Sequence, residues 1–309
     1  MFGRPEFERL AGISVSHLYN LRQTITCRRR CVVMGKTTPA TAAIGERRRP
    51  DPEGRPGYLR ADTVHQPERD GEKSVYPINA VDEITQWEVL GCVPKISELY
   101  PIPVLRAMLD EFPFPILGFH SDNGSEYVND LVAALLEKLR AEFTKSRPRR
   151  SNDNALVETK NGAVVRKNIG YQWLPPSHAG DVHAFYREWF NPCLNYHRPC
   201  GFATVKTDAK GKVKKVYDVY ATPCERLKSL PQAKRFLERG VTFAALDRIA
   251  TADSDTEFAR KMQKAKRDLF RLCAQVGATW PVPLRALVND QPCAAHKALS
   301  RPRPGGSPR

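Results

Sequence analysis

Apolar and polar positions between residues 57 and 93 favour extended structure. The stretch "GYLRADTVHQ", residues 57–66, predicts one strand. Residues 74–93 predict two more strands that pair as a hairpin and turn near Thr85 and Gln86. The first half of this region therefore predicts three consecutive strands without an intervening helix.

Helical and extended spacing alternate from residue 97 onward. Apolar residues recur at helical spacing over residues 97–112 and 128–139, and short apolar runs over residues 114–122 and 141–146 predict strands between and after these helices. A third helix begins within residues 151–168 and is expected to be capped near Asn154. The predicted order is β-β-β-α-β-α-β-α, an α/β unit with a five-stranded sheet.

The two ends of the chain differ from this centre. Residues 5–22 suit a helix-turn-helix in which Gly12 breaks the first helix and Ser14 caps the second, although a generic helical hairpin fits equally well. So little chain precedes this segment that we expect only part of a DNA-binding domain. A basic linker follows it. The predicted domains are residues 1–50, residues 51–190 and residues 191–309.

The C-terminal region contains two further predicted elements. Residues 206–220 favour a lysine-rich hairpin that turns near Lys210 and Gly211, and residues 258–272 favour a late amphipathic helix with a basic outer face. Residues 300–309, rich in Arg, Pro, Gly and Ser, are expected to be disordered.

Charge is unevenly distributed along the 309 residues. The net charge is +7 over residues 1–50, −5 over residues 51–190 and +13 over residues 191–309, which gives +15 for the whole chain. Basic segments on both sides of an acidic centre suit a polyanionic partner, because Lys and Arg displace the counterions of nucleic acid. DNA is therefore the expected partner.

No apolar run approaches the roughly 20 residues of a membrane span, and no signal-peptide pattern opens the chain. The eight cysteines are scattered without the spacing of a disulfide framework. We expect a cytoplasmic, nucleoid-associated protein of bacterial type without membrane contact.

Three acidic residues occupy structurally distinct places in the central region. Asp62 lies inside the first predicted strand, where a charged side chain is otherwise unfavourable. Asp122 ends the fourth strand in "HSDNGSEY", where a simple Asn-Gly turn would be the ordinary explanation. Glu158 lies in the first turns of the third helix, with 35 residues between it and Asp122. Asp82 is a fourth acid nearby, but its place in the second strand does not match this pattern.

Converging carboxylates raise one another's pKa unless a cation neutralises them. Oxygen ligands with room for water suit Mg²⁺ or Mn²⁺, and two such ions assist in-line phosphoryl displacement. If the three acids converge, the sequence predicts a site for Mg²⁺ or Mn²⁺, with two ions expected.

The sequence resembles the catalytic core of the DDE transposases and retroviral integrases, a family with a ribonuclease H-like fold. The motifs that carry the resemblance are Asp62 in "LRADTVHQ", Asp122 in "HSDNGSEY", Glu158 in "SNDNALVETKNG", and "LNYHRPC" followed by "TPCERL", over roughly residues 55–226. The resemblance implies that Asp62, Asp122 and Glu158 are the metal-binding catalytic residues. It also implies that Asn123 and Gly124 shape the loop around the metal, and that the enzyme is oligomeric because two DNA ends must be joined.

The basic residues after Glu158 depart from the family pattern. Many integrases place basic residues four and seven positions after the catalytic glutamate, where this chain has Gly162 and Val165. The bases here are Lys160, Arg166 and Lys167. Lys160 and Lys167 share one stripe of a regular helix and are candidates for phosphate contact, as is Arg166; a solvated helix face is the alternative. Further candidate DNA contacts in the lysine-rich hairpin are Lys212, Lys214 and Lys215.

The resemblance implies a DNA transposase that cuts and joins DNA by metal-dependent phosphoryl transfer. Two alternatives stay open at the level of the sequence. One is a nuclease of the same fold that hydrolyses DNA without strand transfer, and the other is a non-catalytic DNA-binding protein derived from a transposase. The sequence specifies neither the element ends nor the number of subunits.

Overall fold

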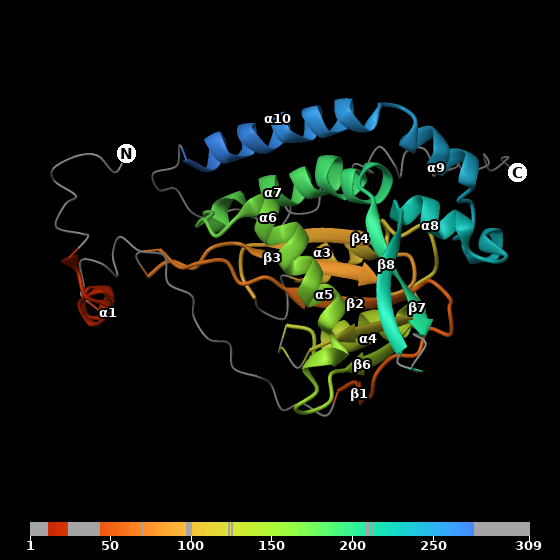
Figure 1. The fold of residues 1–309 in the computed structure, drawn as a ribbon, viewed down its shortest axis with the longest axis horizontal. Coiled ribbons are helices and arrows are strands. Elements are labelled where there is room, and N and C mark those ends of the chain that lie inside the picture. The colour runs from red at the N-terminus through yellow and green to blue at the C-terminus, as the bar shows by residue number, and fades with distance from the viewer. Residues whose placement is uncertain are drawn as a thin grey trace, which may run out of the picture.

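A central mixed β-sheet with helices on both faces organises the protein (Figure 1). The computed structural model describes residues 12–23, 44–69, 71–96, 101–122, 124, 126–207, 211 and 213–274. Within these ranges the sheet has six strands, in the order β1-β6-β5-β2-β3-β4. Their bounds are Glu46–Arg47 (β1), Tyr58–Thr63 (β2), Tyr76–Asp82 (β3), Glu88–Val93 (β4), Gly118–Ser121 (β5) and Glu142–Lys145 (β6).

The strand order and directions are those of a ribonuclease H-like core. Strands β2, β3 and β4 form an antiparallel meander, and β5 and β6 add to β2 in parallel on its other side. The five predicted strands and their order along the chain are confirmed. The predicted strand number is wrong by one, because β1 pairs with β6 in parallel at the sheet edge. A strand of two residues has no alternation from which to recognise it.

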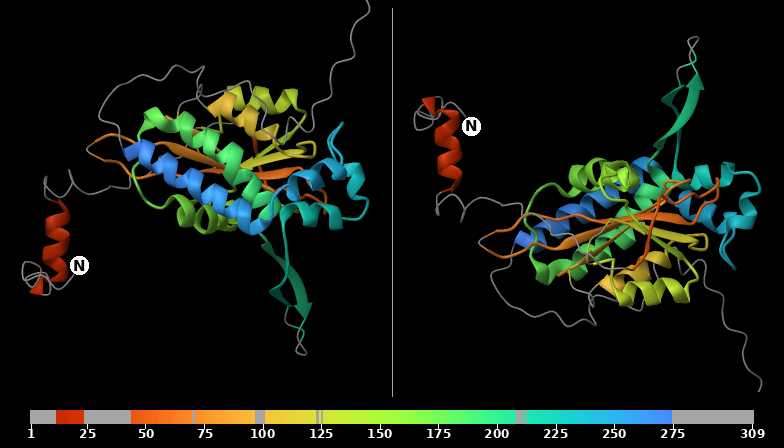
Figure 2. Two further views of the ribbon diagram at one scale, coloured as in Figure 1. Left: turned by 90° about the horizontal axis from the view of Figure 1, so that it is seen from above. Right: turned by 90° about the horizontal axis from the view of Figure 1, so that it is seen from below.

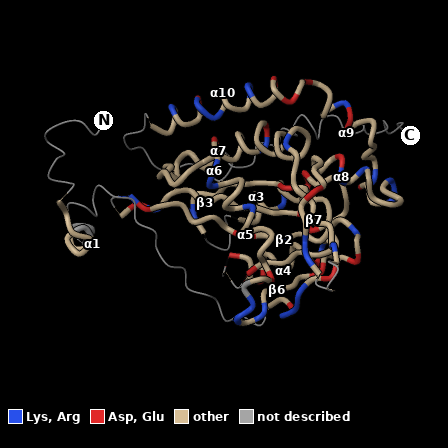
Figure 3. Tube along the Cα trace, viewed as in Figure 1, with Lys and Arg blue, Asp and Glu red and all other residues tan. Residues whose placement is uncertain are grey.

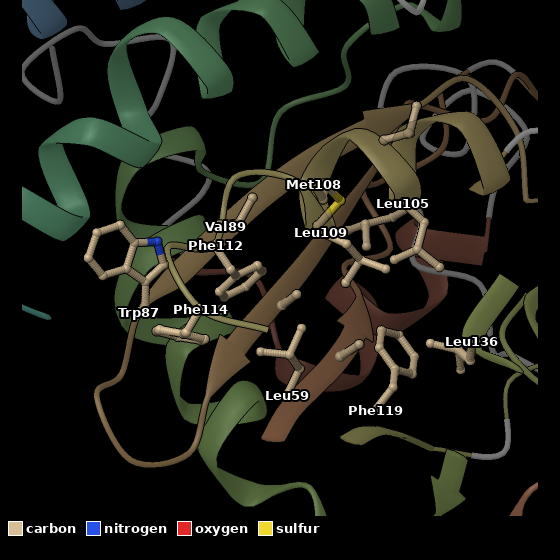
Figure 4. Close-up of a cluster of buried hydrophobic side chains, with 14 of the residues drawn as sticks. Leu59, Trp87, Val89, Leu105, Met108, Leu109, Phe112, Phe114, Phe119 and Leu136 are labelled. Carbon is tan, nitrogen blue, oxygen red and sulfur yellow. The ribbon is translucent and has the colours of Figure 1, made fainter. Parts of the chain in front are cut away.

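One face of the sheet packs against two helices in the first of two hydrophobic clusters (Figure 4). These helices are α3 (Pro101–Leu109) and α4 (Asp130–Lys138), and the Asn129 side chain caps α4 by accepting the N–H of Val132 at 3.0 Å. A Cβ at Gly91 would lie 2.5 Å from the sulfur of Met108, so α3 approaches β4 more closely than any side chain at this position would allow. Both helices were predicted from their apolar spacing.

The opposite face carries the helix with Glu158 and a long helical run. The first helix comprises α5 (Ala155–Lys160), a π-helical turn η3 (Asn161–Arg166) and α6 (Lys167–Ile169). A 3-10 turn η4 (Pro176–His178) opens the second run, which continues through α7 (Ala179–Phe185), η5 (Tyr186–Phe190) and η6 (Cys193–His197). Side chains along β4 alternate between the two faces of the sheet. Val89 and Val93 pack in the first cluster, and Leu90 and Cys92 pack in the second.

Two asparagines in this helical run cover the exposed edge of β4. Asn191 accepts the N–H of Leu90 at 2.9 Å and donates to its carbonyl at 3.1 Å. Four residues later, Asn195 makes the same pair of bonds to the backbone of Glu88, both at 2.8 Å. These side chains satisfy backbone groups that an edge strand otherwise leaves open to other strands. The Asn in "LNYHRPC" therefore has a structural role.

The C-terminal part combines a protruding hairpin with helices. Strands β7 (Cys200–Thr207) and β8 (Val213–Ala221) form a two-stranded ribbon that extends away from the sheet (Figure 2). The helices that follow are α8 (Pro223–Ser229), η7 (Ala233–Phe236), α9 (Phe243–Ala250) and α10 (Asp255–Ala274). Thr222 and Glu225 form a reciprocal capping box at the start of α8. The predicted hairpin and late helix are both present.

The boundary predicted at residue 190 falls within the run from α7 to η6. Helix α10 packs on this run through Met262, Leu269 and Cys273, so the region after residue 190 shares a hydrophobic cluster with the sheet. The second N-terminal helix is present as α1 (Val15–Gln23), with Ser14 Oγ accepting the N–H of His17 at 3.2 Å. The first N-terminal helix and the predicted disordered tail lie outside the described residues. None of the helices in the described ranges is both long and apolar enough to cross a membrane.

Candidate active site

Strands β2 and β5 place two of the three predicted acids beside each other. The strands are parallel neighbours, and Ala61 on β2 pairs with Ser121 on β5. Asp62 and Asp122, which follow this pair along the chain, therefore lie side by side near the carboxyl ends of these strands. Asp62 is half-buried, and its two oxygens accept hydrogen bonds from the Thr63 N–H at 2.9 Å and from Asn161 Nδ2 at 2.6 Å. The Oδ1 of Asp122 accepts the N–H of Gly124 at 2.9 Å. Asp122 thus has both the turn geometry of its Asn-Gly sequence and a place next to Asp62.

Helix α5 carries Glu158, whose side chain is exposed, across this face of the sheet. Asn154 Nδ2 donates to the carbonyl of Ala61 at 3.2 Å, and the Arg60 guanidinium donates to the carbonyl of Asp153, so two bonds fasten the start of α5 to β2. The expected capping by the Asn154 side chain is wrong. Asn154 occupies the N-cap position but makes no capping hydrogen bond, because its amide is directed to β2 instead.

The electrostatics of the site show that its carboxylates interact. Burial, together with the negative charges of Asp122, Glu158 and Glu126, raises the pKa of Asp62 to about 7, while the Thr63 N–H opposes the shift. Within the described residues, no three His, Cys, Asp or Glu side chains are grouped closely enough to hold a metal ion as they stand. The carboxylates are therefore near neighbours without forming a ready-made metal cluster.

The donor chemistry of these residues nevertheless fits Mg²⁺ or Mn²⁺. All the acidic neighbours of Asp62 offer carboxylate oxygens, which are the ligands that these hard cations prefer. Burial is the largest cause of the raised pKa of Asp62, and the repulsion from neighbouring carboxylates that adds to it is the part that a cation would relieve.

Glu126 and His65 lie near the predicted acids, and sequence reasoning missed both. Burial and the charge of Asp122 raise the pKa of Glu126. A Cβ at Gly124 would lie 2.5 Å from a Glu126 carboxylate oxygen, so these two residues lie close together in the loop; Asn123 lies outside the described residues. Burial lowers the pKa of His65, and the charge of Asp122 opposes this shift. Glu126 lies in "HSDNGSEY" and His65 in "LRADTVHQ", so closeness to Asp122 and Asp62 along the sequence could have identified both residues.

A chain of buried amides connects Asp62 to an ion pair in the interior. Asn161 donates to Asp62, its own oxygen accepts from Asn79 Nδ2 at 2.9 Å, and the same Asn79 nitrogen donates to Glu88 Oε1 at 3.2 Å. The other oxygen of Glu88 lies 3.4 Å from the Lys160 ammonium. Because ionised Glu88 only accepts hydrogen bonds, Asn79 must direct its NH₂ group toward Glu88, and Asn161 must in turn direct its NH₂ group toward Asp62.

The structure places the three basic residues after Glu158 in different environments. The Lys160 side chain is only 9% exposed and pairs with Glu88, so it is not a solvated lysine of an open helix face, and its contact with phosphate stays a prediction. Arg166 bonds Gln66 Oε1 at 2.7 Å and the His65 carbonyl at 2.6 Å, and its guanidinium lies 4.6 Å from the Tyr171 ring centre. Lys167 is exposed. DNA contact by Arg166 and Lys167 stays a prediction.

The lysines predicted to contact DNA from the hairpin lie on β8. Lys214 and Lys215 are exposed on this strand, and Lys212 lies outside the described residues. In Figure 3, Lys and Arg positions recur on this hairpin and along α10. Both elements belong to the strongly basic C-terminal region of the sequence.

Asp82 proves to be a turn residue of the core. It is fully buried and accepts hydrogen bonds from the N–H groups of Gly57, Ile84 and Thr85 and from the Thr85 hydroxyl. Burial raises its pKa to about 6 despite these bonds. Its exclusion from the candidate catalytic residues agrees with this structural role.

Parts of this chain are similar to known proteins. No protein-family model matches the chain. The uncharacterized protein y4rM of Sinorhizobium fredii (strain NBRC 101917 / NGR234) is 35% identical over an alignment of 148 residues, and the match covers 44% of this chain and 41% of that relative. The match thus spans about two-fifths of the relative's length.

Two solved structures are similar to part of the chain. One is the simian T-cell lymphotropic virus intasome in complex with PP2A regulatory subunit B56 gamma, with a TM-score of 0.35 and 18% identity over 53% of this chain and 55% of that chain. The other is the catalytic core domain of BIV integrase, with a TM-score of 0.34 and 17% identity over 46% of this chain and 85% of that chain. The ribonuclease H-like architecture described above rests on the strand order of this protein itself.

Proposed function

We propose that this chain is a DNA transposase of the DDE type, which cuts and joins DNA by phosphoryl transfer that depends on a divalent metal. The observation that carries the proposal is the grouping of carboxylates around Asp62. Asp122 follows the adjacent parallel strand, Glu158 lies on the covering helix, and the charges of both raise the pKa of Asp62. Such a grouping of acids is unfavourable unless cations are bound.

Asp62, Asp122 and Glu158 would hold two Mg²⁺ or Mn²⁺ ions. When bound, the ions would supply positive charge at the attacking and leaving oxygens of an in-line displacement. Asn161 fixes the orientation of Asp62 and stabilises its ionised form through the 2.6 Å hydrogen bond. The exposed Glu158 side chain can adjust to a bound group, whereas Asp62 is held from two sides.

The reaction has two steps in this proposal. Water first cleaves a phosphodiester at the end of the element and frees a 3′-OH. This hydroxyl then attacks a phosphodiester of target DNA, so that a new P–O bond forms while the original P–O3′ bond breaks and the leaving oxygen gains a proton. Binding of two DNA ends requires an oligomer, and the exposed Lys214 and Lys215 and the basic C-terminal region favour a polyanionic partner.

Purified protein with labelled end duplexes, supercoiled target DNA and Mg²⁺ or Mn²⁺ tests this function. Asp62→Asn, Asp122→Asn and Glu158→Gln should each abolish cleavage and strand transfer while DNA binding persists. Glu137→Gln is the matched control, because Glu137 is an exposed acid on α4 outside the candidate site. Cleavage without joining would identify a nuclease, and DNA binding without either activity would identify a non-catalytic protein.

A further inference from the structure

A second site lies beside α5, where the base of the β7–β8 hairpin meets the core. It is a cavity of about 1070 Å³. Its walls come from the start of α5, from the β3–β4 turn, from the hairpin and from the segment that joins α8 to η7. The hairpin wall is fixed to the core, because Gln86 Nε2 donates to the Gly201 carbonyl at 2.9 Å. Neither Asp62, Asp122 nor Glu158 lines this cavity.

The cavity lining has an excess of positive charge. Six Lys or Arg residues and three Asp or Glu residues line it. Each of the three acids is already paired with an arginine, at distances of 2.6 to 3.0 Å between the charged atoms. These pairs are Glu53 with Arg55, Glu83 with Arg60, and Asp153 with Arg147. The acids in the wall are therefore neutralised without using all of its cations.

Two of the remaining cations have no acidic partner among the described residues. Arg226 lies with its guanidinium 5.1 Å from the Phe202 ring centre, and its Nε is buried without a hydrogen-bond partner. Lys215 is exposed on the hairpin wall. Arg226 and Lys215 thus place positive charge in the wall with no carboxylate beside it, which favours an anionic ligand.

An exposed aromatic ring lies next to these cations. Tyr217 is 59% exposed, and it faces the same side of β8 as Lys215 because side chains two residues apart share one face of a strand. Phe202 and Phe236 also line the cavity. Cations beside accessible rings are the combination that binds single-stranded nucleic acid, in which phosphates meet the charges and unpaired bases stack on the rings.

We infer that this cavity binds unpaired nucleotides of a DNA strand. Its volume of about 1070 Å³ lies just above the range of about 300–1,000 Å³ for small-molecule pockets, which suits a few unpaired nucleotides better than a duplex. Ala155 and Thr159 form its α5 wall, and Glu158 projects from the same helix. Binding of a strand in this cavity is independent of the proposed function, but its role in the reaction rests on that proposal, because the strand would pass beside the reacting site.

Binding of a fluorescein-labelled 12-residue oligothymidylate to the full chain, measured by anisotropy over a range of salt concentrations, tests the inference. Tyr217→Ser should weaken binding about 5-fold to 150-fold, the range expected for loss of one stacked base. Arg226→Gln and Lys215→Gln should each lower the slope of log affinity against log salt by about 0.7. Lys215 is exposed, so its variant keeps the test valid if the Arg226 variant fails to fold.

Two matched variants serve as controls. Tyr220→Ser removes a tyrosine on the same strand that is 70% exposed but does not line the cavity, and Lys138→Gln removes an exposed lysine on α4, outside the basic C-terminal region. Both should bind as the wild type does. A 2-aminopurine base within the oligonucleotide should be quenched by the wild type and by Tyr220→Ser, but much less by Tyr217→Ser.

The inference is overturned if the Tyr217 and Lys215 variants bind like the wild type, or if a 12-base-pair duplex competes as well as the single strand. Asp62→Asn separates this result from the proposed function, since it should lose strand transfer but keep single-strand binding and base quenching. Quenching by a wild-type protein that neither cuts nor joins DNA would refute the transposase proposal and leave the cavity assignment intact.

Discussion

Replacing Lys160 with methionine distinguishes a buried ion pair from a DNA contact. Methionine keeps the length of the side chain but removes the ammonium group that lies 3.4 Å from Glu88. Glu88 is 1% exposed, and burial already raises its pKa, while the charge of Lys160 opposes that shift. In Lys160→Met, Glu88 is left either as an uncompensated buried charge or as a protonated acid.

Both outcomes give a destabilisation of similar size at pH 7. An unpaired buried charge costs about 3–5 kcal/mol. Protonating a glutamate of ordinary pKa, about 4.3, costs about 3.7 kcal/mol at pH 7, at about 1.36 kcal/mol for each pH unit. Protonation therefore limits the loss to about 3.7 kcal/mol at pH 7 and to about 1.6 kcal/mol at pH 5.5.

The sign of the pH dependence follows from proton uptake. In the variant the folded-state pKa of Glu88 lies above its unfolded value, so the folded protein binds more protons and stability falls as pH rises between the two values. At about 2–4 °C for each kcal/mol, a loss of about 3–3.7 kcal/mol should lower Tm by about 6–15 °C at pH 7 and by less at pH 5.5. The measurement is thermal unfolding followed by circular dichroism at both pH values.

Two further variants complete the experiment. Lys160→Met combined with Glu88→Gln should recover part of the stability, with a coupling of about 1–3 kcal/mol. Lys167→Met is the control, because Lys167 is exposed on the same helix and its loss should change stability by less than about 0.5 kcal/mol. The reasoning is refuted if Lys160→Met unfolds like the wild type at both pH values but lowers the salt dependence of DNA binding.

Three other perturbations have defined outcomes. Replacing Lys212, Lys214 and Lys215 together with alanine should lower duplex affinity equally for all sequences and reduce the salt slope by about 0.9 for each lost phosphate contact, in filter-binding titrations. Burial and neighbouring acids raise the folded-state pKa of Asp62 to about 7, above its value in the unfolded chain, so ionisation of this residue lowers the stability of the fold as pH rises from about 4 to 7. In EDTA, Asp62→Asn should therefore raise Tm at pH 8 and change it little near pH 4. Strand transfer should increase with pH as Asp62 ionises. Asn161→Ala removes a charge-assisted hydrogen bond to Asp62 of about 1.5–3 kcal/mol, so the pH at which activity reaches half its maximum should rise by about 1–2 units. Asn168→Ala, which removes a hydrogen bond to a backbone carbonyl, should leave that pH unchanged.

Local sequence was sufficient to predict the framework of the candidate site. The positions of Asp62 and Asp122 depend on where β2 and β5 lie, and apolar runs bounded by turn residues indicate such strands directly. Glu158 depends on a helix start, which the capping pattern predicts to within a few residues. Each of these features is encoded within about ten residues of the chain.

The partners of individual side chains were not predictable in the same way. Lys160 has a buried position only because Glu88, 72 residues earlier, lies opposite it on β4. Asn154 turns away from its expected cap because the carbonyl of Ala61 is available on β2. Such contacts depend on how the helix lies on the sheet, and nothing in the spacing of residues 151–168 specifies that placement.

The π-helical turn at Asn161–Arg166 changes how distances along the sequence translate into directions around the helix. A π turn bonds residue i to i+5 and contains one residue more than the matching α-helical turn. Arg166, eight residues after Glu158, thus takes the angular position that the seventh residue has on a uniform α-helix. Val165, the seventh residue by count, is buried in the core. The π turn therefore places a basic side chain, the eighth residue by count after Glu158, in the direction that a uniform α-helix would give to the seventh.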